Sequence, residues 1–182
     1  MRRLIHLVPA MAAILTLTAC ATLRVSSHVE RGHDFTRYRT FDWGSADALP
    51  AGDPRLDNDR FFEDHLEGAI EKQMAARGYA RAAVGTVPDV RIHYHAVVAR
   101  HLDVDEADRR SGFCTGDGCL PGIVDYEQGT LIVDVIDAST NRLVWRGWAQ
   151  GSVEGVLGNR ARLARRIDQS VGGLFVRLPA AR

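Results

Sequence analysis

Lysine, net charge and catalytic motifs are all scarce in this sequence, and each shortage argues against a class of function. Lys72 is the only lysine, and the 23 basic side chains are balanced by 23 acidic ones. A nucleic-acid-binding domain carries a strongly basic surface, so this balance argues against a nucleic-acid partner. The chain also has no G-x-S-x-G nucleophile motif and no glycine-rich phosphate loop of either common spacing. We therefore expect a protein that is not an enzyme and binds no cofactor.

A metal site finds only weak support. His93 and His95 alternate on a predicted strand, which places both imidazoles on one face and gives half of a metal site. His101 and Asp134 are the further ligands that such a site would take. A polar, partly wet strand face explains the same histidine pair without a metal, and we favour it. A metal-dependent hydrolase therefore ranks below the binding functions described next.

The N-terminus has the layout of a secretory signal. Its apolar stretch, residues 4–17, follows two arginines and is too short and too interrupted to span a membrane stably. The end of this stretch, Leu17-Thr18-Ala19-Cys20, resembles the lipobox of bacterial lipoproteins. That resemblance implies cleavage after residue 19, with a diacylglycerol and an acyl chain on Cys20 as a stable anchor. Ala21, in place of the aspartate of the enterobacterial sorting rule, implies the outer membrane, with the domain facing the periplasm.

The other two cysteines lie close together in CTGDGC. An exported protein meets an oxidising compartment, where a disulfide between Cys114 and Cys119 is the default. A redox site would want C-x-x-C, and zinc would need further ligands, so we expect a structural bridge that staples a loop. The expected organisation is a signal peptide over 1–19, a lipidated N-terminus and short tether over 20–22, and one domain over 23–182.

Hydrophobic periodicity predicts the elements of that domain. Period-two alternation predicts strands over 22–30, 87–100, 129–137 and 142–151, with a turn at 138–141 and a short extended piece over 34–44. Apolar residues every three to four positions predict helices over 54–77, starting at Asp53-Pro54, and over about 163–178. Residues 101–127 are expected to form a long loop. This order favours an α+β two-layer domain, an antiparallel-rich sheet of four to five strands with both helices on one face.

Several of these segments together resemble one family. They are DFTRYRTFDW, a helix ending in RGY, the strand PDVRIHYHA, and the hairpin GTLIVDVIDASTNRLVWRG, in this order. They resemble the bacterial lipoprotein family classed as domain of unknown function 4136, over nearly the whole mature chain. The resemblance implies an envelope lipoprotein with an α+β domain, and it brings no activity or catalytic residues. The CTGDGC segment lies outside it.

The second face of the hairpin is the most informative surface. If Leu131, Val133, Val135, Leu143 and Trp145 point at the helices, then Ile132, Ile136, Val144 and Trp148 point away, with Asp134 and Arg146 between them. A one-sided sheet should be polar there. Either the 101–127 loop or a partner covers this face. We expect an interaction module whose contact face is built from Ile132, Val144, Arg146 and Trp148.

Two alternatives remain open at this stage. A small apolar or envelope-derived ligand could lie between that face and the stapled loop, in a closed pocket. The last helix is also basic on its outer side, through Arg160, Arg162, Arg165 and Arg166. A solvated helix face explains these arginines, and contact with anionic head groups near the anchor is the sharper reading.

Overall fold

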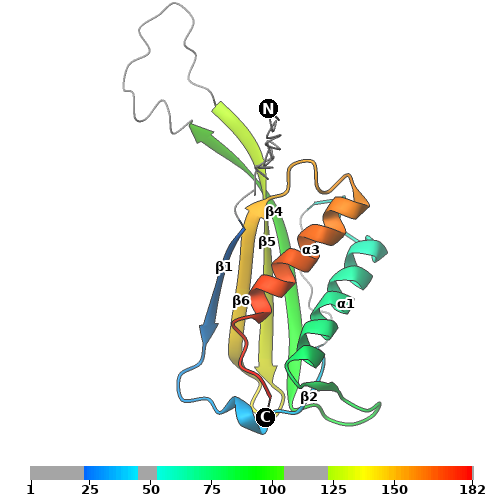
Figure 1. Ribbon diagram of the computed structural model, residues 1–182, viewed down its shortest axis with the longest axis vertical. Coiled ribbons are helices and arrows are strands. Elements are labelled where there is room, and N and C mark those ends of the chain that lie inside the picture. The colour runs from blue at the N-terminus through cyan, green and yellow to red at the C-terminus, as the bar shows by residue number, and fades with distance from the viewer. Residues whose placement is uncertain (1–22, 45–52, 105–122, 182) are drawn as a thin grey trace, which may run out of the picture.

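The computed structural model describes residues 23–44, 53–104 and 123–181 (Figure 1). Six strands form one sheet in the order β1-β6-β5-β4-β2-β3. Two helices, α1 and α3, lie side by side on one of its faces. The elements are β1 Arg24–Val29, the 3-10 turn η1 Phe35–Arg37, β2 Thr40–Trp43, α1 Arg60–Ala76, β3 Ala80–Arg81, β4 Val90–Val104, β5 Ile123–Asp137, β6 Arg142–Ser152 and α3 Arg160–Phe175. The predicted two-layer α+β fold is confirmed, with one strand more than expected.

The sheet is antiparallel except around β2, which runs parallel to both β3 and β4. Strands β4 and β5, 15 residues each, extend well beyond their neighbours. Pairing of β5 with β6 ends at Gln128 and Ser152, whereas pairing of β4 with β5 continues to Val104 and Ile123. The two strands therefore continue as a two-stranded ribbon past the end of the sheet (Figure 1). The predicted loop over 101–127 is wrong at both of its ends, where the chain is paired strand.

Helix α1 begins six residues later than the sequence predicts. Asp59 is its N-cap, and its carboxylate accepts a hydrogen bond from the Phe61 N–H. The predicted start at Asp53-Pro54 is a separate turn in which the Asp53 carbonyl accepts from the N–H of Leu56. Asn58, with a φ of 59°, then interrupts any continuous helix, because left-handed backbone cannot propagate a right-handed one. The predicted apolar stripe is confirmed and buried: Phe62, Leu66, Ile70 and Met74.

Helix α3 follows the predicted stripe and is capped by Asn159, whose side chain accepts from the Arg162 N–H. Its buried face includes Leu163, Ile167, Val171 and Leu174. Gly173 lies within the helix, and a Cβ there would approach the Val25 side chain to 3.2 Å. The missing side chain thus lets α3 lie close to β1. Among the described residues, neither helix is both long and apolar enough to cross a membrane.

The densest part of the core surrounds Trp145. Its side chain is fully buried, and its ring lies 5.8 Å from that of Phe175 on α3. A Cβ at Gly147, two residues further on β6, would collide with the indole and lie 3.1 Å from Leu174. Glycine at this position therefore makes room for the indole between the sheet and α3. Burying a large aromatic side chain in this way contributes roughly 3 kcal/mol.

Candidate functional site

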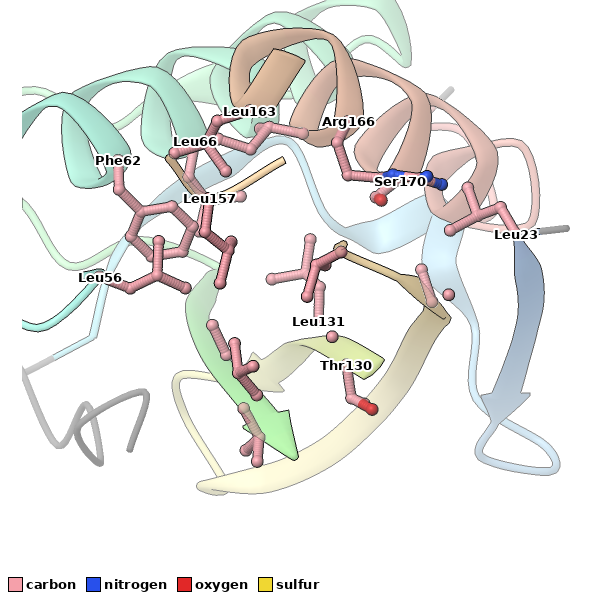
Figure 2. A pocket seen from close by; sticks show the side chains of 18 residues that line it. Leu23, Leu56, Phe62, Leu66, Thr130, Leu131, Leu157, Leu163, Arg166 and Ser170 are labelled. Atoms are coloured by element: carbon pink, nitrogen blue, oxygen red, sulfur yellow. The ribbon is translucent and has the colours of Figure 1, made fainter. Parts of the chain in front are cut away.

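An apolar cavity of about 60 Å³ lies between the sheet and the N-terminal halves of both helices (Figure 2). Small residues on three neighbouring strands form much of its floor. Ala96 on β4 and Ala149 on β6 both pair with Leu131 on β5, and Gly129 pairs with Gly151 one step further along. Alternation in a strand turns every second residue to the same face, so all five positions face the helices. The short side chains leave space that the helices do not fill.

The cavity's roof comes from both helices and from the segments that precede them. Figure 2 shows Phe62 and Leu56 at one end of the cavity and Leu23, the residue just before β1, at the other. Residues of β4 and β5 also contribute, namely Val97, Val98 and Thr130. The lining from α1, α3 and their leading segments is Leu56, Phe62, Leu66, Val153, Leu157, Leu163, Arg166, Ile167 and Ser170. The lining is therefore almost wholly apolar, as is typical of small-molecule sites.

Two polar side chains of α3 line the cavity. Arg166 is half-buried, and Ser170, one turn later, is 7% exposed (Figure 2). Leu163 and Ile167 belong to the same helix face, because residues three and four apart are neighbours on a helix. The prediction that Arg166 lies on the outer, solvated side of this helix is therefore wrong. Arg160, Arg162 and Arg165 are exposed as expected.

A cluster of charged groups lies beside the same end of the sheet. Arg55, in the turn before α1, contacts both Asp53 and Glu127 of β5, the latter at 2.7 Å. Hydrogen bonds from Arg55 outweigh burial and lower the pKa of Asp53 below its ordinary value. Arg55 thus ties the segment that carries Leu56 to the sheet. These ion pairs therefore add to the core packing of Leu56, which is 5% exposed, in holding one wall of the cavity in place.

The outer face of the sheet, which points away from the helices, carries Ile132, Asp134, Arg146 and Trp148. The guanidinium of Arg146 donates two hydrogen bonds of 2.6 Å to the carboxylate of Asp134. These hydrogen bonds raise the pKa of Arg146 above its ordinary value. Ile132 and Trp148, paired on the next row, are half-buried. The outer face therefore combines an apolar row with a bidentate ion pair.

Val144 does not belong to that face, which corrects the prediction. It is fully buried in the core, while Leu143 pairs with Ile136 on the outer face. The register between β5 and β6 shifts at Val135 and Ile136, where β6 has one extra residue. Such a bulge breaks the strict alternation of side chains. Val144 and Trp145 consequently both belong to the core, and the predicted orientations of Leu143 and Val144 are exchanged.

His93 and His95 share the outer face, as β4 alternation predicts. No group of three metal-ligating side chains occurs among the described residues. His93 pairs with Asp134, but both oxygens of that carboxylate are bound by Arg146. The imidazole of His93 instead packs where a Cβ on Gly44 would lie. His101, stacked on Tyr126 in the ribbon, is about 20 Å further along β4 than His95.

Other predicted sites lie outside the described residues. They are the lipidation site Cys20 and the disulfide pair Cys114 and Cys119. These three predictions therefore stay predictions.

A buried polar cluster lies at the opposite end of the sheet from the cavity and was not predicted from the sequence. The hydroxyl of Tyr38 donates to the carboxylate of Asp137 at 2.7 Å, and the ring of His33 stacks on Tyr38. Asp137, 1% exposed, also accepts hydrogen bonds from the backbone N–H groups of Ser139 and Thr140. Burial alone raises the pKa of Asp137, but these hydrogen bonds outweigh it and hold the pKa well below its ordinary value. The cluster fastens the β5–β6 turn to the segment before β2.

The cavity was not predicted either, although two features of the sequence point to it. Ala and Gly replace β-branched residues at alternate positions of β4, β5 and β6, and Arg166 interrupts an apolar helix stripe. These features gain meaning only when the strand register brings the small residues together.

Comparisons with known proteins place this fold. The model of a family described as a domain of unknown function, DUF4136, matches residues 25–180. The crystal structure of a DUF4136 family protein from Bacteroides thetaiotaomicron superimposes with a TM-score of 0.50 and 14% identity, over 82% of this chain and 94% of that one. A PDZ domain protein from Parabacteroides distasonis gives a TM-score of 0.54 and 14% identity over 88% of this chain. This chain spans 37% of that protein's length. No curated protein matches the chain.

Proposed function

The chain belongs to the DUF4136 family, a domain of unknown function, and we propose that this member is a lipid-anchored envelope protein that binds an apolar ligand without catalysis. The observation that carries the proposal is the cavity between the helices and the sheet. It is lined by side chains from both layers and is almost wholly apolar. The interior of a well-packed domain contains few voids larger than a water molecule. A ligand would recover the contacts that the lining side chains forgo here.

The ligand's position differs from the alternative suggested by the sequence, which placed it on the outer face under the 101–127 loop. The cavity lies on the other face of the sheet, beneath α1 and α3 (Figure 2). Leu23 lines it and is three residues after Cys20. Three residues of chain span at most about 11 Å, so an anchor at Cys20 would hold the cavity close to the membrane surface. Such a position suits a ligand that comes from the envelope.

Ligand binding is tested by what copurifies with the full chain. We expect mass spectrometry of an organic extract of the purified protein to find an apolar compound at near-stoichiometric amounts. Ala96→Leu, which fills the floor of the cavity, should lose this compound. Ile132→Leu is the matched control, because Ile132 follows Leu131, the partner of Ala96, and lies on the outer face of the sheet. This variant should keep the compound. A wild-type protein that carries no such compound, or a filled variant that keeps it, contradicts the proposal.

The anchor is tested separately. Cells that express the full chain are grown with a radioactive fatty acid, and the protein is then isolated under denaturing conditions. The wild-type chain should be labelled and should fractionate with the outer membrane, whereas Cys20→Ser should be unlabelled. Equal labelling of both chains would remove Cys20 as the lipidation site.

An interaction module on the outer face is the second candidate. It is favoured by the half-buried Ile132 and Trp148 beside the Asp134–Arg146 pair, since tryptophan and arginine are enriched at protein contacts. A photo-crosslinking residue at Trp148 in intact cells should give a discrete adduct that the same residue at the exposed Arg162 does not give. Crosslinks from Trp148 only to the chain itself would argue against a partner there.

A further inference from the structure

Positive charge is concentrated at the start of helix α3. Residues 160–166, RARLARR, hold four of the 23 basic side chains of the chain and no acidic one. Three of these arginines are exposed, and we call them the α3 patch: Arg160, Arg162 and Arg165. Helix α1, which lies beside α3, has the opposite balance, with four acidic residues and two basic ones. The positive charge therefore belongs to one helix and not to the helix layer as a whole.

The α3 patch does not help its own helix. A helix N-terminus carries partial positive charge, so arginines there are disfavoured, and the first turn of α3 contains no acidic residue to offset them. Arg162 and Arg165 are three positions apart, a spacing at which like charges on a helix repel each other. The ion pair that joins the two helices in the described part of the chain links His65 to Asp168 and leaves the α3 patch out. Helix stability and helix packing therefore do not explain this charge.

Two of the side chains are nevertheless held in place. The guanidinium of Arg160 lies over the ring of Phe61, 5.2 Å from its centroid, and the guanidinium of Arg162 donates a hydrogen bond to the carbonyl of Gly155. Neither contact neutralises a charge. The α3 patch is thus a partly ordered positive surface that a negatively charged partner would complement.

The α3 patch lies at the end of the domain that would carry the lipid anchor. Strand β1 starts at Arg24, which pairs with Gln150 near the end of β6, the strand that leads into α3. In Figure 1 the first residues of β1 and of α3 lie at the same end of the sheet. Leu23 and Arg166, the residue that follows the patch, line the same cavity (Figure 2). An anchor three residues before Leu23 therefore brings the α3 patch to the membrane surface.

We propose that the α3 patch binds the phosphate groups of anionic phospholipids in the membrane that holds the Cys20 lipid, an inference that rests on the anchor in the proposed function. The guanidinium fork matches phosphate oxygens, and the opposite charges strengthen these hydrogen bonds. A basic side chain close to an anionic membrane contributes roughly fivefold to the binding constant. The anchor also keeps the lipid surface within reach of the arginines at high effective concentration, whereas an acidic protein would have to be bound from solution.

This contact would set the orientation of the domain. The α3 patch and the cavity lie on opposite sides of the same two helical turns, because Leu163 and Ile167 line the cavity. Lipid contact at the patch therefore places one helix of the cavity's roof against the membrane. The opposite end of the sheet, where β6 begins at Arg142, would stay away from it.

The test measures how fast phenylglyoxal modifies each arginine of the full-length lipidated protein, with the sites identified by mass spectrometry. The protein is held in nanodiscs of phosphatidylcholine alone or of equal parts phosphatidylcholine and phosphatidylglycerol. We expect Arg162 and Arg165 to react at least about threefold more slowly in the anionic nanodiscs. Exposed Arg142, at the other end of the sheet, should react equally in both. About 1 M sodium chloride, at which the Debye length is about 3 Å, should remove the protection.

Two double variants show whether the charges act together. In Arg162→Gln/Arg165→Gln, the remaining patch residue Arg160 should lose most of its protection by phosphatidylglycerol. Arg142→Gln/Arg177→Gln removes two other exposed arginines and should leave the protection of Arg160 as in the wild type.

The outcomes separate this inference from the proposed function. Equal rates at Arg162 and Arg165 in the two kinds of nanodisc overturn the inference, while the anchor and the cavity ligand stand. Slow reaction in both kinds indicates that protein, not lipid, covers the α3 patch, and it also overturns the inference. If the protein enters neither kind of nanodisc and Cys20 carries no lipid, the anchor and the inference fall together.

Discussion

The helix-facing side of the sheet is filled differently at its two ends, although the same two helices cover both. At the packed end, one cross-strand row consists of Ile92, Val135 and Trp145, all at most 2% exposed. At the hollow end, the corresponding row is Ala96, Leu131 and Ala149, and the next row contains Gly129 and Gly151. Side-chain volume thus falls along the strands while the helix layer continues over them.

The helices show the same difference along their length. The N-terminal residues of the buried stripes line the cavity, Phe62 and Leu66 on α1 and Leu163 and Ile167 on α3. The C-terminal ones, such as Met74 and Leu174, are fully buried against the packed end. A core packed to native density gives stability, whereas a void costs stability and gives room for a ligand. The comparison indicates that one end of the layer holds the fold, and it supports our proposal that the other end binds a ligand.

Removing Trp145 tests the packed end most severely. Trp145→Ala should lower the free energy of unfolding by about 3–5 kcal/mol, because it leaves a large cavity under Phe175. Trp145→Phe should lose much less, since the indole N–H finds no hydrogen-bond partner among the described residues. Urea unfolding of the full chain, followed by circular dichroism, gives the values. Trp148→Ala, on the half-buried outer face, is the control, and an equal loss there would contradict the assignment of the core to Trp145.

Replacing a carboxylate should also lower the stability more at the packed end than at the hollow end. Asp137→Asn weakens several hydrogen bonds to a buried carboxylate and should cost about 1.5–3 kcal/mol at neutral pH. Asp53→Asn, at the hollow end, should cost less, because its partner Arg55 is 43% exposed and the pair is screened by water.

The pH dependence of unfolding tests the role of Asp137 further. The pKa of Asp137 is lowered in the folded protein, so below the ordinary aspartate pKa of about 4 the unfolded chain takes up a proton first. The stabilisation from Asp137 is complete above that value and is lost as the pH falls toward the lower folded pKa. Unfolding measured from pH 6 to pH 3 should therefore show a smaller loss of stability for Asp137→Asn than for the wild type. Parallel curves would show that another group carries the acid sensitivity.

Adding a methyl group at Gly147 tests how tightly the packed end is filled. Gly147→Ala places a Cβ against the indole of Trp145 and 3.1 Å from Leu174, so the packed end must shift to admit it. Overpacking of this kind should cost about 1–2 kcal/mol, measured as a lower urea midpoint with an unchanged m-value. Gly172→Ala is the matched control, because nothing lies within 4 Å of its added Cβ and alanine favours helix. It should leave the stability unchanged or raise it slightly.

Hydrophobic periodicity predicted the fold because the elements at the packed end follow regular helix and strand repeats. The α1 stripe from Phe62 to Met74 repeats every four residues, and the β5–β6 turn ends at Asn141, which adopts a φ of 54°. Local signals misplaced the start of α1, because Asp53-Pro54 suits a turn as well as a helix start. The alternation rule also failed at Val144, because an extra residue in β6 depends on pairing with β5 rather than on local sequence.

The cavity could not be predicted because it is a property of register. Ala96, Gly129 and Ala149 are far apart in sequence, and only the pairing of β4, β5 and β6 brings them onto one floor. Arg166 looked like one arginine of a solvated helix face, since its neighbours Arg162 and Arg165 are exposed. Its position three residues after Leu163 and four before Ser170 was the available sign that it shares the buried face.

Filling the hollow end should have the smallest effect on stability and the opposite sign. Ala96→Leu adds three carbons to the floor of the cavity and should raise the free energy of unfolding by up to about 1 kcal/mol in ligand-free protein. The same variant should lose the copurifying apolar compound, so stability and binding change in opposite directions. At the packed end, where Val133 is fully buried, Val133→Leu adds only one carbon and should destabilise instead. If Ala96→Leu is also destabilised by 1 kcal/mol or more, the space beneath the helices is already filled by side-chain motion, and the two ends do not differ in the way proposed.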